Sequence, residues 1–240
     1  MRPKVSTIFI TYQERPRWLA EAFDSVLRQE GVDLQVIVAT VVGDPAVDVA
    51  LKLGLEVCAC DHAGIYYQIN SALPLVQGDW YVLSGGNDVL LPTKFIHEVE
   101  ACQTKGGKVC YSDMYQADER LKNRQYAAFR DYSYAVHMTV GNIVPDDAML
   151  TREVLEKYKP FRDDLFGEIA IYDFWLRIAE GEGEEVFVRN ARAEYIYRCG
   201  LDSQHVKRRR NKKAYRKYKQ TLADLREYHR VHCRPRRSAR

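Results

Sequence analysis

The sequence predicts an α/β protein with a mostly parallel sheet flanked by helices, followed by a basic C-terminal helical tail. Apolar, strand-like runs alternate with segments of helical spacing from residue 5 to residue 111. The runs are nearly continuous in hydrophobicity, as is typical of parallel strands covered on both faces. Polar, glycine-containing segments follow several of them, where loops at one edge of such a sheet form ligand sites.

The elements follow one another in a strand–helix order. Val5–Thr11 is rich in β-branched residues, and Arg17–Gln29 then has the apolar stripe of a helix. The other expected strands are Leu34–Val42, Leu55–Cys60, Trp80–Leu83 and Lys108–Tyr111, and the other expected helices are Ala46–Leu53, Ile65–Leu73 and Thr93–Thr104.

Length and composition exclude several classes of protein. A chain of 240 residues with 46% apolar and 29% charged residues is not wholly disordered or fibrous. No apolar stretch approaches the roughly 18 residues of a spanning helix, and the N-terminal run is too short for a signal peptide. The six cysteines include no Cys-x-x-Cys pair. We therefore expect a reduced, cytoplasmic protein, and neither a P-loop nor a dinucleotide fingerprint is present.

Several segments carry a resemblance to a known family. They are VSTIFITYQERPRWLAEAFDSVLRQ, DHAGIYYQINSALPLVQGDWYVLSGGNDVLLP, VPDDAMLTREVLEKYKPFRDDLFGE, IYDFWLRIAEGEGEEVFV and YIYRCGLDSQ. In this order they resemble the inverting family 2 glycosyltransferases, which have the GT-A fold, over about residues 4–205. The resemblance implies transfer of a sugar from a nucleoside-diphosphate sugar, with a UDP-sugar as the expected donor.

The resemblance implies a donor site above the strand ends. Thr11 and Tyr12 are expected to line the base pocket with Glu14 and Arg15 nearby, and Asp44 replaces the acid that usually follows the second strand. The residues that match the helix facing the donor are Asp61, Gly64, Tyr66 and Asn70. Gly64 could instead serve only as a helix entry, and Asn70 could face solvent.

The family's acidic metal motif, DxD, is degenerate in this chain. Its register falls on Gly85-Gly86-Asn87, followed by Asp88, so Gly86 is expected at the donor and Asn87 and Asp88 at a Mn²⁺ or Mg²⁺ ion. Alternatively, Asp88 caps a following helical turn. Cys199-Gly200 stands where the family often has a metal-ligating histidine, and His205 could substitute for it.

Inversion requires a general base for the acceptor hydroxyl. The family's acidic pair is split here: Glu168 fits one alignment and Asp173 the other. The two are about 140° apart around a helix, so an unbroken helix cannot present both to one substrate. Asp173 could instead form a surface ion pair with Arg177, and Glu168 could be a helix N-terminal acid. Glu168 is slightly preferred because of its loop position.

The basic tail is the other unusual feature. Residues 207–240 contain 15 Lys and Arg against Asp224 and Glu227, whereas residues 1–206 contain 21 against 31 acids. Residues 207–232 predict a helix whose apolar stripe consists of Tyr215, Tyr218, Leu222 and Leu225. This stripe could dock on the acidic body, lie on an anionic membrane or, less favoured, bind nucleic acid. A metal at His229, His232 and Cys233 is expected to be incidental.

Together these observations predict a glycosyltransferase domain over residues 1–206 and a tail over residues 207–240. Within the domain, residues 1–113 would bind the nucleotide sugar and residues 114–206 the acceptor, which would be a glycan, a lipid-linked saccharide or a polysaccharide end. Peripheral membrane contact would come from the tail. The alternative is a non-catalytic protein of the same fold that acts through its tail.

Overall fold

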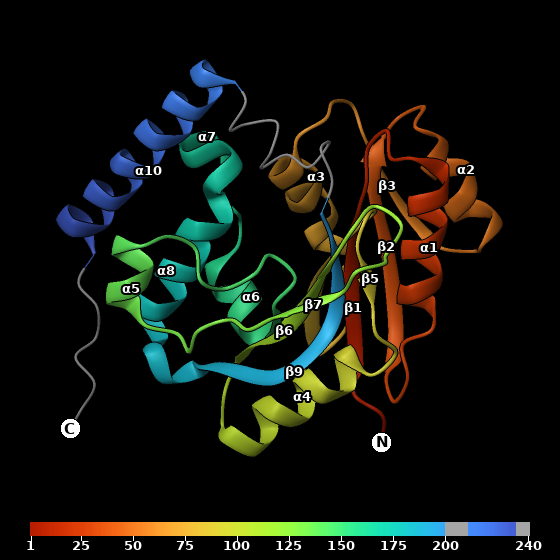
Figure 1. Ribbon diagram of the computed structural model, residues 1–240, viewed down its shortest axis with the longest axis horizontal. Helices are drawn as coiled ribbons and strands as arrows, with labels where there is room; N and C mark the ends of the chain where they lie inside the picture. Colours follow the sequence, from red (N-terminus) through yellow and green to blue (C-terminus); the bar gives the residue numbers. More distant parts are fainter. Residues whose placement is uncertain (200–210, 234–240) are drawn as a thin grey trace.

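The computed structural model describes residues 1–199 and 211–233 (Figure 1). The strands are β1 (Lys4–Ile10), β2 (Asp33–Val41), β3 (Glu56–Cys60), β4 (Trp80–Gly85), β5 (Val89–Leu90), β6 (Val109–Ala117), β7 (Gln125–Ala127), β8 (Met149–Thr151) and β9 (Phe187–Arg198). The helices are α1 (Pro16–Leu27), α2 (Pro45–Lys52), α3 (Ile65–Ala72), α4 (Lys94–Lys105), α5 (Tyr134–Thr139), α6 (Arg152–Tyr158), α7 (Asp163–Phe166), α8 (Ala170–Glu182) and α10 (Lys212–His232), and the 3-10 turns are η1 (Leu73–Leu75), η2 (Gly167–Ile169) and η3 (Glu184–Val186).

The predicted α/β class with a mostly parallel sheet is confirmed. The strand order is β3-β2-β1-β4-β8-β6-β9-β5, with β7 paired to β6. The long strands run parallel, β1 with β2 and β4, β2 with β3, and β6 with β9, while the short strands β5, β7 and β8 pair antiparallel. The carboxyl ends of β1, β2 and β4 therefore lie at one edge, as the strand–helix order requires.

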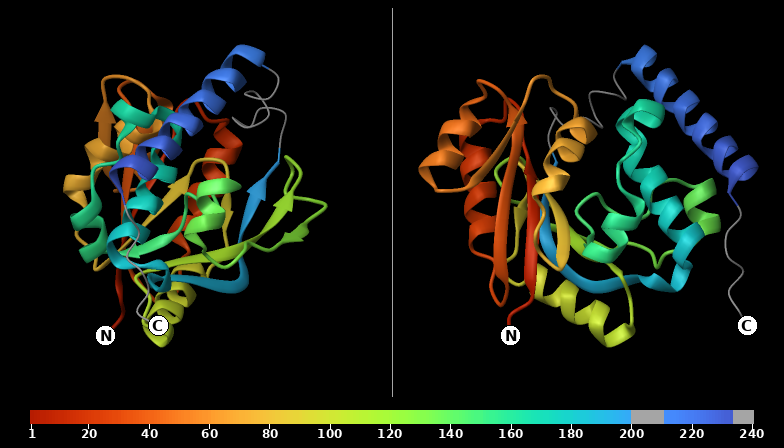
Figure 2. Two further views of the ribbon diagram at one scale, coloured as in Figure 1. Left: turned by 90° about the vertical axis from the view of Figure 1, so that its left-hand side faces the viewer. Right: turned by 180° about the vertical axis from the view of Figure 1, so that it is seen from behind.

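Helices cover both faces of the sheet (Figures 1 and 2). Alternate residues of the strands point to opposite faces, so Phe9 packs under α1, α2 and α4 whereas Ile8 packs under α3, α6 and α8. Strand β6 continues past the expected end at Tyr111 because β9 pairs with it as far as Ala117. Its polar residue Asp113 is accommodated by an ion pair with Arg189 at 2.6 Å.

Helix α10 lies along the outer side of α7 and α8 (Figures 1 and 2). Of the expected apolar stripe, Leu225 is fully buried, and Tyr218 and Leu222 pack with it against Phe166 and Leu176. The stripe therefore docks on the body, while Tyr215 stays 37% exposed. The expected start of this helix at residue 207 lies outside the described residues. Among the helices that the structure does describe, none combines the length and apolar character that a membrane crossing needs.

Candidate functional site

The loops after β1 and β2 are joined by Asp44. This buried carboxylate accepts the backbone N–H of Gln13 at 2.7 Å through Oδ2 and caps α2 through Oδ1, which accepts from Ala46 N at 2.9 Å. Gln13 has a φ of 50°, so the β1 loop turns sharply at this point. Asp44 thus lies at the expected sheet edge, and its first role is to fix the shape of the loop that carries Tyr12.

Hydrogen bonds also join the ends of β1 and β2, below this loop, to α3. Thr11 is buried and Tyr12 is 45% exposed, so the chain leaves the sheet between them. The side-chain amide of Gln68 on α3 donates to the carbonyl oxygens of Thr11 and Ala39, both at 3.2 Å. Gln68 was not anticipated from the sequence, because a buried glutamine in an amphipathic helix gives no local signal of the two strands that it joins.

The loop after β4 approaches the β1 loop at Gly86. A Cβ atom at Gly86 would lie 2.8 Å from Thr11 Oγ1, 3.1 Å from Thr11 Cβ and 3.5 Å from Glu14 Cγ. The backbone N–H of Gly86 also donates to the carbonyl of Ile10 at 3.1 Å. Only a residue without a side chain fits this approach, so Gly86 brings the expected base-binding and metal-binding segments together.

Asp88 lies half-buried at the end of the β4 loop. Its Oδ1 accepts the backbone N–H of Arg198 at 2.9 Å, and no hydrogen bond within the described residues engages Oδ2. Burial raises the pKa of Asp88 to about 7, and the nearby charges of Asp147 and Glu14 act in the same direction. No helical turn follows Asp88, because β5 begins at Val89. The alternative that Asp88 caps such a turn is therefore wrong.

Arg198, at the end of β9, clamps this loop in place. Arg198 is 2% exposed, and its guanidinium donates to Asn87 O at 2.8 Å, Glu119 O at 2.6 Å and Glu21 Oε2 at 2.7 Å. It also lies over the ring of Trp18 at 4.9 Å. The only sequence signal for Arg198 is its place in YIYRCG, where the family resemblance points instead to Cys199-Gly200 and to His205. Cys199 is exposed; Gly200 and His205 lie outside the described residues.

Arg15 and Glu14 lie on the outer side of the same corner. The Arg15 guanidinium stacks over Trp18 at 4.1 Å and pairs with Glu119 at 3.2 Å, and Glu14 Oε1 accepts the Arg15 N–H at 2.9 Å. Trp18 is thus covered by both Arg15 and Arg198. This edge of the sheet therefore has the guanidinium of Arg15 at its rim and the buried guanidinium of Arg198 behind the β4 loop.

The residues expected to face the donor from β3 and α3 lie in different environments. Asp61 is exposed at the end of β3, where the hydroxyl of Tyr67 donates to it at 2.7 Å and lowers its pKa. Gly64 is the N-cap residue of α3, as the helix-entry alternative expected. Tyr66 is buried and stacks on Phe161 at 5.6 Å.

Asn70 points neither at the donor edge nor freely into solvent. Its Nδ2 donates to Phe161 O at 2.8 Å, and its Oδ1 accepts from Phe161 N at 2.9 Å. Nδ2 also donates to Asp163 Oδ1 at 3.2 Å. Asn70 therefore ties α3 to the segment that leads into α7, which positions the second half of the site relative to the first.

Glu168 is exposed in the 3-10 turn η2, immediately before α8. It borders a hollow of about 570 Å³ between α7, η2 and the first half of α10. The residues that line the hollow include Asp164, Phe166, Glu168, Lys217, Tyr218 and Thr221. The combination of carboxylates, aromatic rings and a lysine is suited to binding a molecule that carries many hydroxyl groups.

Asp173, the other candidate base, lies inside the protein. Its side chain is 0% exposed and lies 2.9 Å from Nε of both Arg162 and Arg177 and 3.0 Å from His229 Nε2. Burial alone would raise the pKa of Asp173, but the hydrogen bonds from His229 and Arg162 and the charge of Arg177 hold it below its ordinary value. The Asp173–Arg177 pair exists, but it is buried rather than on the surface, and the carboxylate is closed to an acceptor.

The fold is shared with solved glycosyltransferases. No family model and no curated protein sequence matches the chain. Residues 1–349 of S. aureus TarS, in complex with UDP, match 95% of this chain and 72% of theirs with a TM-score of 0.66 at 14% identity. Glucosyl-3-phosphoglycerate synthase from Mycobacterium tuberculosis, with Mn²⁺, UDP and phosphoglyceric acid, matches 93% of this chain and 78% of its own at a TM-score of 0.64 and 15% identity.

A third similar structure is the mannosyltransferase PcManGT from Pyrobaculum calidifontis with GDP-Man and Mn²⁺. It matches 94% of this chain and 70% of its own, with a TM-score of 0.58 at 14% identity. The chain spans 44% of the longer TarS structure. The predicted GT-A fold is thereby confirmed, and at such low identity the likeness concerns the fold.

Proposed function

We propose that the protein transfers a sugar from a nucleoside-diphosphate sugar, with a UDP-sugar as first candidate, to an acceptor hydroxyl with inversion. The observation that carries this proposal is the meeting of the β1 and β4 loops at Gly86, on the carboxyl-terminal edge of the sheet, in a fold that is similar to enzymes solved with UDP. Tyr12 is exposed over this edge beside Arg15. The nucleobase of the donor would stack or form hydrogen bonds there, and its diphosphate would extend toward Asn87 and Asp88.

The β4 loop has oxygen donors that suit a divalent cation. Asp88 Oδ2 and the side-chain oxygen of Asn87 would hold Mn²⁺ or Mg²⁺ together with oxygens of the donor diphosphate. The raised pKa of Asp88 fits this role, because burial and the charges of Asp147 and Glu14 outweigh the contacts with Arg198, and a bound cation would stabilise the carboxylate. When bound, such an ion neutralises the charge that develops on the leaving diphosphate. Arg198 holds the loop backbone in the conformation that presents these atoms.

Glu168 is the carboxylate that we assign as general base. It would accept the proton of the acceptor hydroxyl as that oxygen attacks the anomeric carbon, while the bond from this carbon to the diphosphate oxygen breaks on the opposite face. Glu168 is exposed and borders the hollow, whereas Asp173 is enclosed by two arginines and a histidine. Asp173 then positions α8, the helix that begins two residues after Glu168.

The hollow beside Glu168 is the proposed acceptor site. The half-buried Tyr218 offers aromatic surface for a sugar ring, and the nearby Asp164 offers hydrogen-bond acceptors for its hydroxyls. Lys217 and its exposed basic neighbours on α10 lie at the rim, so an acceptor on an anionic lipid carrier could be reached from a membrane surface. A glycan or a lipid-linked saccharide is the acceptor class that this lining favours.

Two measurements test the proposal in sequence. The first is a thermal-shift screen with UDP, GDP, CDP and TDP, each with Mn²⁺ or with EDTA. At 100 times the dissociation constant a nucleotide adds about 2.7 kcal/mol, which corresponds to a shift of about 5–11 °C in a chain of this size. A shift with one nucleotide that falls in EDTA is expected. No shift with any nucleotide would overturn donor binding and favour the non-catalytic alternative.

The second measurement is UDP release from UDP-glucose and UDP-GlcNAc with oligosaccharide acceptors. Glu168→Gln should lower turnover by about 10²-fold or more, because a neutral amide cannot take the proton, while the UDP shift is retained. Glu100→Gln, at an exposed position on α4, is the matched control. Wild-type turnover in Glu168→Gln would refute the assignment of the base and leave donor binding intact.

A further inference from the structure

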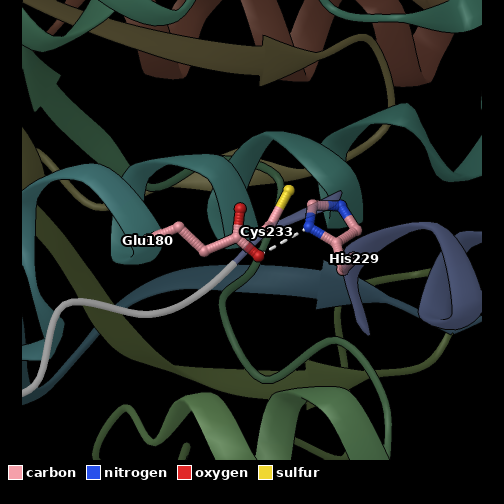
Figure 3. A group of neighbouring side chains, drawn as sticks. All are labelled: Glu180, His229 and Cys233. Carbon is pink, nitrogen blue, oxygen red and sulfur yellow. Dashed lines mark hydrogen bonds and ion pairs between the residues drawn. The ribbon is translucent and has the colours of Figure 1, made fainter. Parts of the chain in front are cut away.

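The carboxyl-terminal end of α10 meets α8 at a group of three potential metal ligands (Figure 3). Glu180 lies on α8, His229 lies on α10, and Cys233 is the first residue after α10. His229 and Cys233 are four residues apart, so the helix brings them to the same side. One ligand atom from each residue, a carboxylate oxygen, an imidazole nitrogen and the sulfur, lies within 4.8 Å of the others.

His229 is held in the orientation of a metal ligand. Its side chain is 0% exposed, with Nδ1 2.6 Å from Glu180 Oε1 and Nε2 3.0 Å from Asp173 Oδ1. A carboxylate on one imidazole nitrogen fixes the ring and its tautomer, and such a partner is characteristic of histidines that bind metal through the other nitrogen. Asp173 supplies this outer contact, so Nδ1 is the nitrogen directed at Glu180 and toward Cys233.

The charges of the surroundings suit a divalent cation. Asp173 is already neutralised by Arg162 and Arg177, whose Nε atoms both lie 2.9 Å from its carboxylate. The negative charges left for an ion are the carboxylate of Glu180 and the thiolate that Cys233 becomes on binding metal. Together they carry a charge equal and opposite to that of one doubly charged ion, at a place where His229 is buried and Glu180 and Cys233 are half-buried.

We propose that Glu180, His229 and Cys233 form a Zn²⁺ site that fastens α10 to α8. Sulfur, imidazole nitrogen and carboxylate oxygen are the three ligand types that zinc takes in proteins, and a water molecule would complete the tetrahedron. In such a tetrahedron the ligand atoms are about 3.3–3.6 Å apart. The Glu180–His229 contact therefore opens by about 0.7 Å as the ion enters, and Cys233 closes toward it.

The site is separate from the cation expected at the donor edge. Oxygen ligands at Asn87 and Asp88 favour Mn²⁺ or Mg²⁺, whereas a thiolate favours zinc. The three ligands lie on α8 and α10, which pack together through the apolar cluster around Leu225. Zinc would thus set the position of the helix that forms one wall of the hollow beside Glu168, and the site can be tested whether or not the protein transfers sugars.

Cobalt and zinc binding to the full chain tests the proposal directly. The protein is stripped with a chelator, kept reduced with a phosphine, and titrated with Co²⁺ and then Zn²⁺. We expect one Zn²⁺ per chain and, with Co²⁺, a thiolate charge-transfer band that Zn²⁺ displaces. Cys233→Ser should remove the band and weaken zinc binding roughly tenfold or more. Cys199→Ser and His232→Asn are the matched controls, because both alter exposed residues outside the group, and they should keep the band.

Alkylation of the wild-type chain gives a second readout that needs no variant to fold. Zn²⁺ should protect the Cys233 thiol from iodoacetamide, as read by mass spectrometry, while the exposed Cys199 continues to react. A band that is absent from the wild type, or that survives Cys233→Ser, overturns the site. Equal alkylation of Cys233 with and without Zn²⁺ overturns it too, and His229 is then held by its two carboxylates alone.

Discussion

Replacing Asp173 by Asn separates a structural role from a catalytic one. The carboxylate is 0% exposed and joins Arg162 at the start of α7, Arg177 on α8 and His229 on α10. Asn has nearly the same shape as Asp, but it has no charge and only one side-chain oxygen. It can therefore accept hydrogen bonds from only some of the three donor side chains. Two buried or half-buried guanidinium groups would be left with less compensation than in the native protein.

The expected loss of stability follows from these contacts. Breaking a buried ion pair by removing one partner costs about 3–5 kcal/mol. Both arginines keep other acceptors: Arg177 keeps Tyr158 O and Pro160 O, and Arg162 keeps the hydroxyl of Tyr228. The lower end of the range therefore applies. We therefore expect Asp173→Asn to cost about 3 kcal/mol, which is a fall in Tm of about 6–12 °C for a chain of this length.

Urea unfolding followed by circular dichroism measures this loss, with Glu100→Gln as the surface control. The difference also depends on pH in a defined direction. Because the folded protein lowers the pKa of Asp173, its contribution is fully present above the unfolded pKa of about 4 and is lost as the pH falls through the folded pKa. The curves of variant and wild type should converge in acid. A difference below about 0.5 kcal/mol at neutral pH, with turnover abolished, would refute the structural assignment and restore Asp173 as a base.

Three further outcomes are expected. Leu225→Ala should lower the free energy of unfolding in urea by about 2–5 kcal/mol, because it empties a fully buried position between α10 and α8; an unchanged midpoint would mean that α10 is not docked in solution. Gly86→Ala should reduce the UDP-induced thermal shift, since its methyl group would meet Thr11 at 2.8 Å, and an undiminished shift would place the nucleotide elsewhere. Arg198→Met should abolish the Mn²⁺-dependent part of that shift, because the β4 loop loses the hydrogen bond at Asn87 O, whereas retention of the Mn²⁺ effect would count against the clamp.

The sequence by itself determined the α/β class and, apart from the two-residue strand β5, the order of the strands and α-helices through β6. These features depend on local sequence. A run of β-branched residues favours a strand, apolar residues at helical spacing favour a helix, and Gly43-Asp44-Pro45 favours the end of a strand, largely independently of the rest of the chain. For the same reason the expected bounds of β1, α1 and β2 are within two residues of the observed ones.

The tertiary structure alone decided what the individual side chains do. The sequence offers Glu168 and Asp173 as two similar acidic candidates five positions apart. Packing of α10 buries Asp173 and leaves Glu168 beside a hollow. Arg198 gained its importance from contacts with residues 79 to 177 positions away. Burial and the charges of residues distant in sequence set the pKa and the accessibility of a carboxylate or a guanidinium. Neither can be inferred from the residues that are adjacent in the sequence.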